Sequence, residues 1–235
     1  MDLQNKVALI TGGTKGIGRG IAEALLEAGM RVAITSRHLD AAQETAAALG
    51  DDSTVLGLEA DVRSLESQED AVAKTLEAFG QLDVLIANAG VGHFDPITEL
   101  SADHWNQTIE TNLTGVFYSV KAAVDALKQS KGYIITIASL AGTNFFKGGA
   151  AYNASKFGLV GFTQAIMLDL RDADVKVTTI MPGSVATHFN GNQPDDSDGW
   201  KIQPEDLGQM TVDLLRMPPR TLPSKIEVRP AKTKN

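Results

Sequence analysis

The sequence has no cysteine and fewer basic than acidic residues, with 21 Lys and Arg against 29 Asp and Glu. Without cysteine, the chain has no disulfide bond, no thiolate nucleophile and no Cys-ligated metal site. The formal net charge of −8 argues against a nucleic-acid-binding surface, which needs clustered basic side chains. His and acidic residues show no metal-ligand spacing either, so we expect no metal site.

Long apolar runs are also missing. No stretch reaches the ~18 apolar residues that a membrane-spanning helix needs. Residues 1–13 lack the basic segment and the long apolar run of a secretory signal peptide, so we expect a cytoplasmic protein without membrane partners. The chain has 235 residues, of which 43% are hydrophobic, and this suffices to bury a sizeable core.

Short β-branched apolar runs alternate with longer amphipathic segments along the whole chain. This alternation predicts an α/β fold: a Rossmann-type, doubly wound sheet of about seven parallel strands with helices on both faces, in a single domain of residues 1–235. Such a sheet binds its ligand at the carboxyl ends of the strands. The strands are expected at 6–11, 31–36, 54–60, 82–87, 133–138, 175–181 and 225–228, and the helices at about 17–28, 39–49, 64–79, 103–129, 151–171 and 204–216.

Two segments in the last third of the chain are less regular. Residues 190–199 are polar and rich in turn-forming residues, which predicts a mobile loop. We expect this loop to belong to a substrate loop at about 187–203 that can act as a lid. The tail, residues 230–235, is expected to fray.

Three glycines, Gly12, Gly16 and Gly18, lie between the first expected strand and the first expected helix. At such a place, bare backbone can approach a pyrophosphate at the helix N-terminus. The spacing G-x-x-x-G-x-G differs from the G-x-G-x-x-G fingerprint of dinucleotide-binding folds, so a tight turn with close helix packing is the alternative. The order of strand, glycines and helix favours a dinucleotide site.

The end of the second expected strand indicates which dinucleotide binds. A carboxylate there would bind the ribose 2′-hydroxyl of NAD, but the strand ends at Ser36 and Arg37, and Asp40 already lies in the next helix. The 2′-phosphate of NADP needs cationic donors, for which the planar fork of arginine is well shaped. Lys15, inside the glycine loop, supplies a second cation. Either cation alone is typical of a solvated surface, but the two together favour NADP(H).

Tyr152 and Lys156 lie one helical turn apart in the segment YNASK. A tyrosine with its ordinary pKa near ~10 is a poor acid at neutral pH. An ammonium group about 6 Å away, at an effective dielectric constant near ~20, stabilises the phenolate by about 3 kcal/mol. This attraction would bring the pKa of Tyr152 well below its usual range, toward neutral pH. Ser139, at the end of the fifth expected strand, can donate a hydrogen bond to the same substrate oxygen.

Seven short motifs follow one another along almost the whole chain: TGGTKGIG (11–18), Asp61-Val62, ANAG (87–90), Asn112 in TNLTGVF, Ser139 in IASLAG, YNASK (152–156) and PGSVAT (182–187). Taken singly, each is typical of a turn or an inert surface, but the set in this order is specific. It resembles the short-chain dehydrogenase/reductase family, in the branch that contains 3-oxoacyl-carrier-protein reductases and small carbonyl reductases.

The resemblance implies a role for each matched residue. Tyr152 corresponds to the general acid/base, Lys156 to the residue that lowers its pKa and binds the nicotinamide ribose, and Ser139 to the hydroxyl that holds the substrate oxygen. Asn112 corresponds to the residue whose backbone carbonyl helps to hold a water of the proton relay. Ala87 replaces an asparagine of many members, which puts one local hydrogen bond in doubt. With the glycine loop and the end of the second strand, the expected cofactor-binding residues are Gly12, Thr14, Lys15, Gly16, Ile17, Gly18, Ser36, Arg37, Asp61, Val62, Asn88, Ala89, Gly90, Tyr152, Lys156, Pro182, Gly183, Val185 and Thr187.

Loops after the fourth, fifth and sixth expected strands are expected to select the substrate. Aromatic side chains in these loops can form an apolar wall, or they can pack locally beneath their own loops. No arginine pair marks a carboxylate or phosphate site, so we expect a substrate that is neutral or bound loosely at its polar end. The expected substrate-binding residues are Ser139, His93, Phe94, Phe145, Phe189 and Trp200, with Val91, Phe146 and His188 beside them.

The leading hypothesis is an NADPH-dependent oxidoreductase that reduces a carbonyl, in a ketone or a 3-oxoacyl thioester, to a secondary alcohol in a reversible reaction. The net negative charge of the chain argues against the 3-oxoacyl thioester substrate on a carrier protein, because an acidic carrier protein needs a basic docking surface. The alternative is an NADP(H)-binding sensor or scaffold with little turnover. A nucleotide-sugar epimerase is a third option, but those chains look longer. The resemblance implies a homotetramer or homodimer that forms through the helices at 103–129 and 151–171 and the C-terminal strand.

Overall fold

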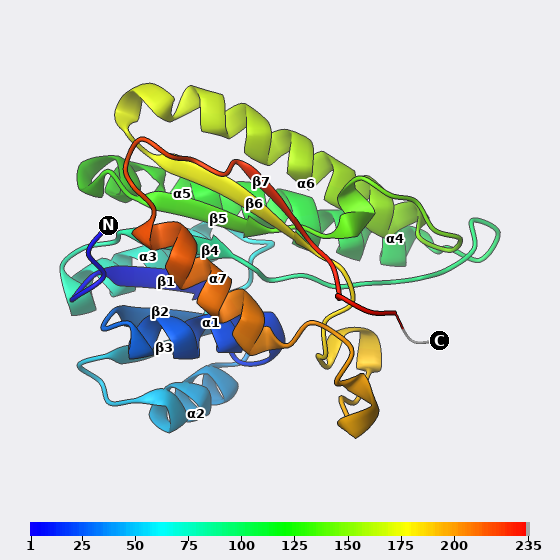
Figure 1. The fold of residues 1–235 in the computed structure, drawn as a ribbon, viewed down its shortest axis with the longest axis horizontal. Coiled ribbons are helices and arrows are strands. Elements are labelled where there is room, and N and C mark those ends of the chain that lie inside the picture. Colours follow the sequence, from blue (N-terminus) through cyan, green and yellow to red (C-terminus); the bar gives the residue numbers. More distant parts are fainter. Residues whose placement is uncertain (234–235) are drawn as a thin grey trace.

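Seven parallel strands form one sheet in the order β3-β2-β1-β4-β5-β6-β7 (Figure 1). The computed structural model describes residues 1–233 of the chain. The expected single-domain, Rossmann-type α/β fold is confirmed. The strands are β1 (Val7–Thr11), β2 (Arg31–Ser36), β3 (Val55–Glu59), β4 (Val84–Ala87), β5 (Tyr133–Ile137), β6 (Lys176–Pro182) and β7 (Lys225–Val228). The helices are α1 (Gly16–Glu27), α2 (Leu39–Leu49), α3 (Leu65–Phe79), α4 (Ala102–Ile109), α5 (Gly115–Ser130), α6 (Ala150–Asp169) and α7 (Pro204–Arg216).

The strand order reverses between β1 and β4, which pair with each other inside the sheet. Leu9 of β1 lies opposite Ala33 of β2 on one side and opposite Leu85 of β4 on the other. From this point the chain builds outward to β3 in one direction and to β7 in the other. The connections on the two sides therefore diverge, which opens a crevice at the carboxyl ends of the central strands.

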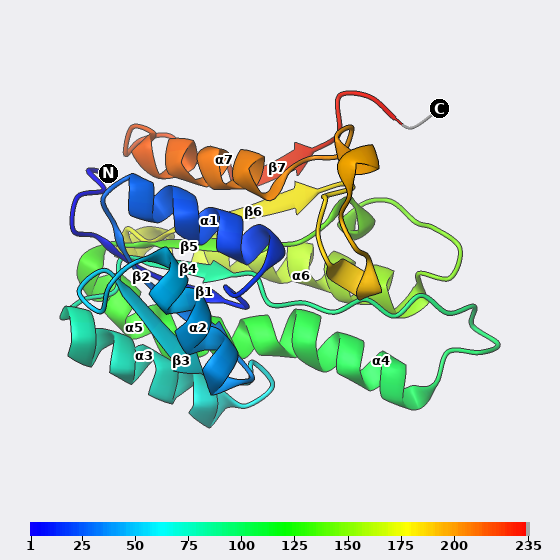
Figure 2. The ribbon, with the colours of Figure 1, turned by 90° about the horizontal axis from the view of Figure 1, so that it is seen from below.

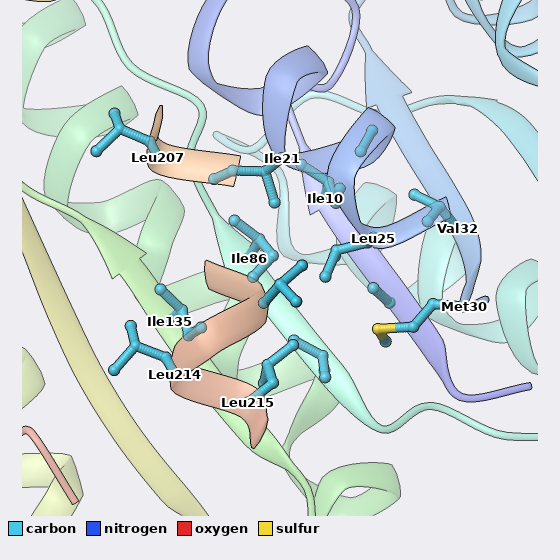
Figure 3. Packing of buried hydrophobic residues seen from close by; sticks show 14 of the residues in the cluster. Ile10, Ile21, Leu25, Met30, Val32, Ile86, Ile135, Leu207, Leu214 and Leu215 are labelled. Atoms are coloured by element: carbon cyan, nitrogen blue, oxygen red, sulfur yellow. The ribbon is translucent and has the colours of Figure 1, made fainter. Parts of the chain in front are cut away.

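Helices cover both faces of the sheet (Figure 2). Ile10 of β1 packs in one apolar cluster with α1, α2 and α7, and its neighbour Leu9 packs in a second cluster with α3, α5 and α6. Figure 3 shows Ile21 and Leu25 of α1 and Leu215 of α7 within the first cluster. Because both faces of the sheet are buried, its strands appear in the sequence as continuous apolar runs.

The long helix expected at 103–129 is interrupted, which corrects that prediction. A π-helical turn, Glu110–Thr114, separates α4 from α5, and the amide of Gly115 donates to the carbonyl oxygen of Glu110. The polar and apolar residues keep a helical period through this turn, so the pattern alone does not reveal it. A π turn shifts the hydrogen-bond register of a helix, and such turns are frequent at functional sites. This one contains Asn112.

The segment between β6 and α7 lies beyond the carboxyl ends of the strands, as Figures 1 and 2 both show. It contains two short 3₁₀ turns, Phe189–Gly191 and Asp196–Asp198. An isolated parallel bridge between Val185 and Ile202 ties its two ends together. Fraying was predicted for residues 230–235. Two of these residues, 234–235, lie outside the described residues. Within residues 1–233, no helix has both the length and the apolar composition needed to span a membrane.

Candidate active site

A cleft of about 900 Å³ opens at the carboxyl ends of the central strands. Its walls come from the glycine loop after β1, the ends of β2 to β5, helix α6 and the segment after β6. All but Gly18 of the residues expected to bind the cofactor line this cleft. They are Gly12, Thr14, Lys15, Gly16, Ile17, Ser36, Arg37, Asp61, Val62, Asn88, Ala89, Gly90, Tyr152, Lys156, Pro182, Gly183, Val185 and Thr187.

The glycine loop presents bare backbone to the cleft. Gly12 and Gly16 have φ values of +65° and +56°, in the left-handed region that favours glycine. Gly18 is buried, and a Cβ there would lie 2.4 Å from the carbonyl oxygen of Gly12. Gly18 therefore supports the loop from behind and does not line the cleft. Because α1 begins at Gly16, its free amides lie beside this backbone, an arrangement that suits a pyrophosphate.

Asn88 holds the glycine loop in place. Its Nδ2 donates to the carbonyl oxygens of Thr11 at 2.9 Å and of Gly12 at 3.0 Å. In return, the Thr11 hydroxyl oxygen accepts from the amides of Asn88 at 3.0 Å and Ala89 at 3.1 Å. The end of β4 and the end of β1 are thus locked together by side-chain bonds where the strand order reverses.

Cations lie where the second and third strands end. Lys15 and Arg37 line the cleft, as does Arg63, a residue that the sequence analysis missed. Arg63 binds the carboxylate of Asp61 with two nitrogens, at 3.0 Å through Nε and 2.6 Å through Nη2. This guanidinium holds the pKa of Asp61 below its usual range, and the charge of Arg37 lowers it further. Arg37 thus lies close enough to Asp61 to act on its charge.

Tyr152, Lys156 and Ser139 meet at the wall formed by α6. The Lys156 Nζ lies 5.7 Å from the ring centre of Tyr152 and donates to the carbonyl oxygen of Ile137 at 3.0 Å. The Ser139 side chain lies close enough to the Tyr152 hydroxyl to lower the pKa of that phenol. The Ser139 oxygen also accepts from the amide of Ala141 at 3.1 Å, which fixes the serine at the start of the turn that follows β5.

The pKa values of Tyr152 and Lys156 differ from those expected from the attraction between phenolate and ammonium alone. Burial raises the pKa of Tyr152, and the hydrogen bond to Ser139 opposes that rise only in part. Burial also lowers the pKa of Lys156 to about 8. The expected depression of the Tyr152 pKa is therefore wrong for this structure, because it neglected the cost of removing both groups from water. Below pH ~8 the site pairs a protonated phenol with a buried ammonium group.

Asn112 is fully buried and does not line the cleft. Its Oδ1 accepts from the amide of Val91 at 2.8 Å, and its Nδ2 donates to the Val91 carbonyl at 2.9 Å and to Ser155 Oγ at 3.1 Å. Ser155 in turn donates to the carbonyl oxygen of Tyr152 at 2.8 Å. The side chain of Asn112 thus ties the loop after β4 to the turn of α6 that carries Tyr152.

Aromatic rings from three loops surround Tyr152. Phe94 meets it at 5.3 Å, Phe189 at 5.8 Å and Phe146 at 6.4 Å between ring centres. Phe94 and Phe189 line the cleft, as do Val91 and His188. The expected apolar wall is thus present. Phe146 does not line the cleft itself, but its ring packs on Phe94 and Tyr152 and so supports the wall.

Three side chains expected to bind substrate lie elsewhere. His93 stacks on His104 at 4.1 Å, and His104 is paired with Asp95. Phe145 is 84% exposed and stacks on Phe157 at 5.4 Å, so it points away from the neighbouring Phe146. Trp200 lies outside the cleft lining as well. In this structure the three side chains do not line the cleft, because the direction of a loop side chain depends on its packing partners, which the sequence does not reveal.

The sequence analysis missed several other residues of the cleft. Some of them are direct sequence neighbours of expected residues, so extending each motif by a few positions would have included them. Others reach the cleft only because α2 packs against β2 and β3. None of them forms a metal site, since the described residues contain no cluster of three metal-ligating side chains. The missed residues are Thr35, His38, Ala41, Glu44, Thr45, Ala60, Arg63, Thr111, Ile137, Ala138, Ser184, Asn192 and Lys201.

Comparison with known sequences shows the family. The sequence model described as short chain dehydrogenase matches residues 6–198. An uncharacterized oxidoreductase from Staphylococcus saprophyticus is 35% identical, over 98% of this chain and 99% of its own. A second one, from Staphylococcus aureus strain MRSA252, is 34% identical, over 97% of this chain and 98% of its own.

Solved structures share the whole fold. An alcohol dehydrogenase from Thermococcus sibiricus, complexed with 5-hydroxy-NADP, has a TM-score of 0.91 at 30% identity and covers 99% of both chains. A 3-ketoacyl-(acyl-carrier-protein) reductase from Brucella melitensis, complexed with NADH, has a TM-score of 0.88 at 26% identity and covers 97% of this chain and 98% of its own. Together with the glycine loop and the Ser139, Tyr152 and Lys156 group, these matches show that the chain is an oxidoreductase that belongs to the short-chain dehydrogenase family.

Proposed function

We propose that this protein reduces a neutral carbonyl compound to a secondary alcohol with NADPH, reversibly, and that Tyr152 donates the proton. One observation carries the proposal: Ser139 and Tyr152 line the same cleft as the glycine loop, and the Tyr152 ring lies 5.7 Å from the Lys156 ammonium. The glycine loop would hold NADPH, which would supply the hydride for the carbonyl carbon.

The raised pKa of Tyr152 suits the reducing direction. A phenol that stays protonated at neutral pH is available to give its proton to the carbonyl oxygen as negative charge develops there. Ser139 donates a hydrogen bond to the same oxygen, and the Lys156 charge stabilises the phenolate that remains. The resemblance implies that the backbone carbonyl of Asn112, in the π turn, would help to hold a water of the proton relay. In the oxidising direction the same residues act in reverse.

The preference for NADPH rests on Lys15 and Arg37. Both line the cleft, at the glycine loop and just after β2, where a cation suits a 2′-phosphate better than a 2′-hydroxyl. Asp61 has its carboxylate engaged by Arg63, which removes much of the repulsion that it would exert on a phosphate. One matched structure holds an NADP derivative and the other NADH, so the preference of this protein is inferred from its own side chains.

The substrate loop at about 187–203 is proposed to cover the cleft. It contributes Phe189, Asn192 and Lys201 to the lining, and a bridge at Val185–Ile202 joins its ends as a hinge would require. Closure of such a loop would exclude water from the carbonyl during reduction.

A homodimer or homotetramer is part of the proposal. Phe117, Phe157 and Leu168, on α5 and α6, are large apolar side chains that remain exposed on the single chain. A second copy packed on these helices would bury them. Light scattering during gel filtration measures the mass directly, and a monomer of 24.9 kDa would contradict this part.

A spectrophotometric screen for NADPH oxidation tests the main proposal. The panel holds simple ketones, diketones and 3-oxoacyl thioesters, with NADH in parallel. Turnover is expected for at least one class, and Tyr152→Phe should reduce it by about 10² or more while NADPH binding stays nearly unchanged. Undiminished turnover of Tyr152→Phe would refute the assigned acid. If no compound of the panel causes NADPH or NADH oxidation, the sensor or scaffold alternative is favoured.

A further inference from the structure

We propose that the substrate end of the cleft selects ketones that carry a planar aromatic ring beside the carbonyl group. The inference rests on the proposed function and adds the substrate class to it. Phenyl rings from three separate segments surround the ring of Tyr152: Phe94 follows β4, Phe146 follows β5 and Phe189 follows β6. An aryl group bound at the Tyr152 hydroxyl would enter this cluster.

The rings meet edge to face or at a tilt, not as parallel stacks. The Phe94 ring meets the Tyr152 ring at 5.3 Å between centres, with an interplanar angle of 84°. Phe94 also meets the Phe146 ring, at 5.5 Å and 74°. Phe189 lies 5.8 Å from Tyr152 at 55°. In such contacts the positive edge of one ring lies against the negative face of the next. An aryl ketone can extend this pattern with its own ring, whereas a saturated ring lacks the quadrupole that the pattern requires.

The cluster still has apolar surface to bury. Phe94 is 39% exposed and Phe146 is 44% exposed, although each packs on neighbouring rings. Phe94 and Phe189 line the cleft with their ring centres 6.4 Å apart. A flat ring laid against both would remove exposed apolar surface from them, and this burial is the main source of affinity in an apolar pocket.

Cations on this side of the cleft are already engaged. Within the described residues, α6 and the loops after β4, β5 and β6 bring two cationic side chains to the cleft, Lys156 and Lys201. Lys156 donates to the carbonyl oxygen of Ile137, and Lys201 pairs with Asp198 at 2.7 Å. A carboxylate or phosphate on the substrate would have to share these lysines with the partners they already have. The site therefore favours a neutral aryl ketone over an acidic one.

Gly92 allows the rings to approach across the cleft. A Cβ at this position would lie 2.7 Å from two ring carbons of Phe189 and 2.9 Å from a ring carbon of Phe94. Real Cβ atoms do not tolerate such distances, so any other residue would push the rings apart. Gly92 is thus a specificity-determining position, although it has no side chain of its own.

Two neutral methyl ketones with the same number of carbon atoms, acetophenone and cyclohexyl methyl ketone, test the inference by kinetics. Since the two differ in intrinsic reactivity, the quantity compared among variants is the ratio of their kcat/KM values. Each ring contributes about two- to tenfold, so Phe94→Leu and Phe189→Leu should each reduce the aryl-to-cyclohexyl ratio by that factor. Phe145→Leu is the matched control, because Phe145 is 84% exposed and points away from Tyr152. It should leave the ratio unchanged.

Binding of the two product alcohols provides a readout without turnover. In the presence of NADPH, 1-phenylethanol and 1-cyclohexylethanol cannot react, so ligand-observed NMR titration yields their Kd values. The phenyl alcohol is expected to bind about tenfold more tightly to the wild-type protein, and Phe189→Leu should weaken this preference. The same titration without cofactor tests the pocket alone.

The possible outcomes separate the two proposals. Equal Kd values for the two alcohols, or a kinetic ratio that neither Phe94→Leu nor Phe189→Leu changes, overturn the aromatic-substrate inference even if both ketones are reduced. Selective binding of 1-phenylethanol that is lost in Phe189→Leu, without turnover of any ketone, supports the aromatic site and overturns the proposed reductase function.

Discussion

The ammonium nitrogen of Lys156 lies 5.7 Å from the ring centre of Tyr152 and donates a 3.0 Å hydrogen bond to the carbonyl oxygen of Ile137. Lys156 is 4% exposed, and burial is the cause that lowers its pKa to about 8. A protonated lysine in this place is costly, because water would solvate the charge better than a single carbonyl does. The protein keeps this charge next to the phenol whose ionisation it would assist.

The first prediction concerns stability and pH. Between about pH 8 and 10.5 the unfolded chain holds a proton at Lys156 that the folded protein has lost, so this group makes stability rise with pH in that window. Below about pH 8 the buried charge of Lys156 destabilises the folded protein by its full amount. This amount is about 3 kcal/mol, because burial lowers the pKa of Lys156 from 10.5 to about 8. We expect Lys156→Met to be more stable than the wild type at pH 7, and the difference to shrink toward pH 10.

Urea unfolding at pH 7 and pH 9.5 measures this difference in the free energy of unfolding. Lys128→Met, at an exposed position of α5, is the matched control and should show no such trend. A stability difference between Lys156→Met and the wild type that stays constant over this range would contradict the assigned burial cost.

The pH dependence of turnover forms a second prediction. In the free protein, Lys156 loses its charge as the pH rises through about 8, while Tyr152, whose pKa burial raises, stays protonated. The profile of kcat/KM for NADPH, which reports the free protein, should therefore decline above about pH 8 in the reducing direction. A profile that is flat to pH 9.5 would show that the charge of Lys156 does not assist the reaction.

The glycine loop allows a third prediction. A Cβ at position 18 would lie 2.4 Å from the carbonyl oxygen of Gly12, so Gly18→Ala must displace the loop backbone. We expect a loss of about 1–3 kcal/mol in the free energy of unfolding and weaker NADPH binding. Both quantities can be measured by urea unfolding and fluorescence titration.

Gly161→Ala on α6 is the control for that variant. Apart from its chain neighbours and the nearby backbone of its own helix, no heavy atom of the described residues lies within 4 Å of the position that its Cβ would take. Alanine is the better helix former, so this variant should gain up to about 1 kcal/mol. A loss there would indicate that a second copy of the chain packs closely on α6.

Asn112 carries the fourth prediction. Asn112→Leu keeps the approximate volume but leaves the partly buried amide and carbonyl of Val91 without their partner, and removes the donor to the Ser155 hydroxyl oxygen. Unsatisfied buried groups cost about 1–3 kcal/mol each, so the free energy of unfolding should fall by at least about 2 kcal/mol. Asn106→Leu, at an exposed position of α4, should change it little. Equal effects of the two substitutions would refute the bridging role.

Cofactor preference provides the fifth prediction. Arg37→Gln removes a cation that lines the cleft next to Asp61, and we expect NADPH affinity to fall by about 10- to 100-fold. NADH affinity should stay nearly constant, because NADH has no 2′-phosphate. Arg216→Gln, at an exposed position of α7, serves as the charge-matched control. A parallel loss of NADH binding would show that Arg37 does not discriminate between the two.

Strand and helix placement was largely predictable from the residues. The expected ranges 31–36, 39–49, 204–216 and 225–228 match β2, α2, α7 and β7 as observed. Buried parallel strands and amphipathic helices have different local periods, and both periods are visible in a short window. The π turn at Glu110–Thr114 was not predictable, since it changes the hydrogen-bond register without changing the apolar pattern.

The cofactor end of the cleft was predictable for a related reason. Residues that follow parallel strands all reach the same edge of the sheet, so the chain order of Gly12, Arg37 and Asn88 implies that they lie around one cleft. Gly18 was the exception, because its tight packing against the Gly12 carbonyl is a contact between elements.

The sequence by itself thus determined the doubly wound sheet, the family and most residues that line the cleft, because local periodicity and strand order carry that information. Only the tertiary structure decided that Phe146 and not Phe145 packs on Tyr152, since the direction of a loop side chain depends on what lies across from it. It also decided the charges of the Tyr152 and Lys156 pair. Their spacing suggested attraction, whereas burial, a property of the whole fold, raises the pKa of the phenol and lowers that of the lysine.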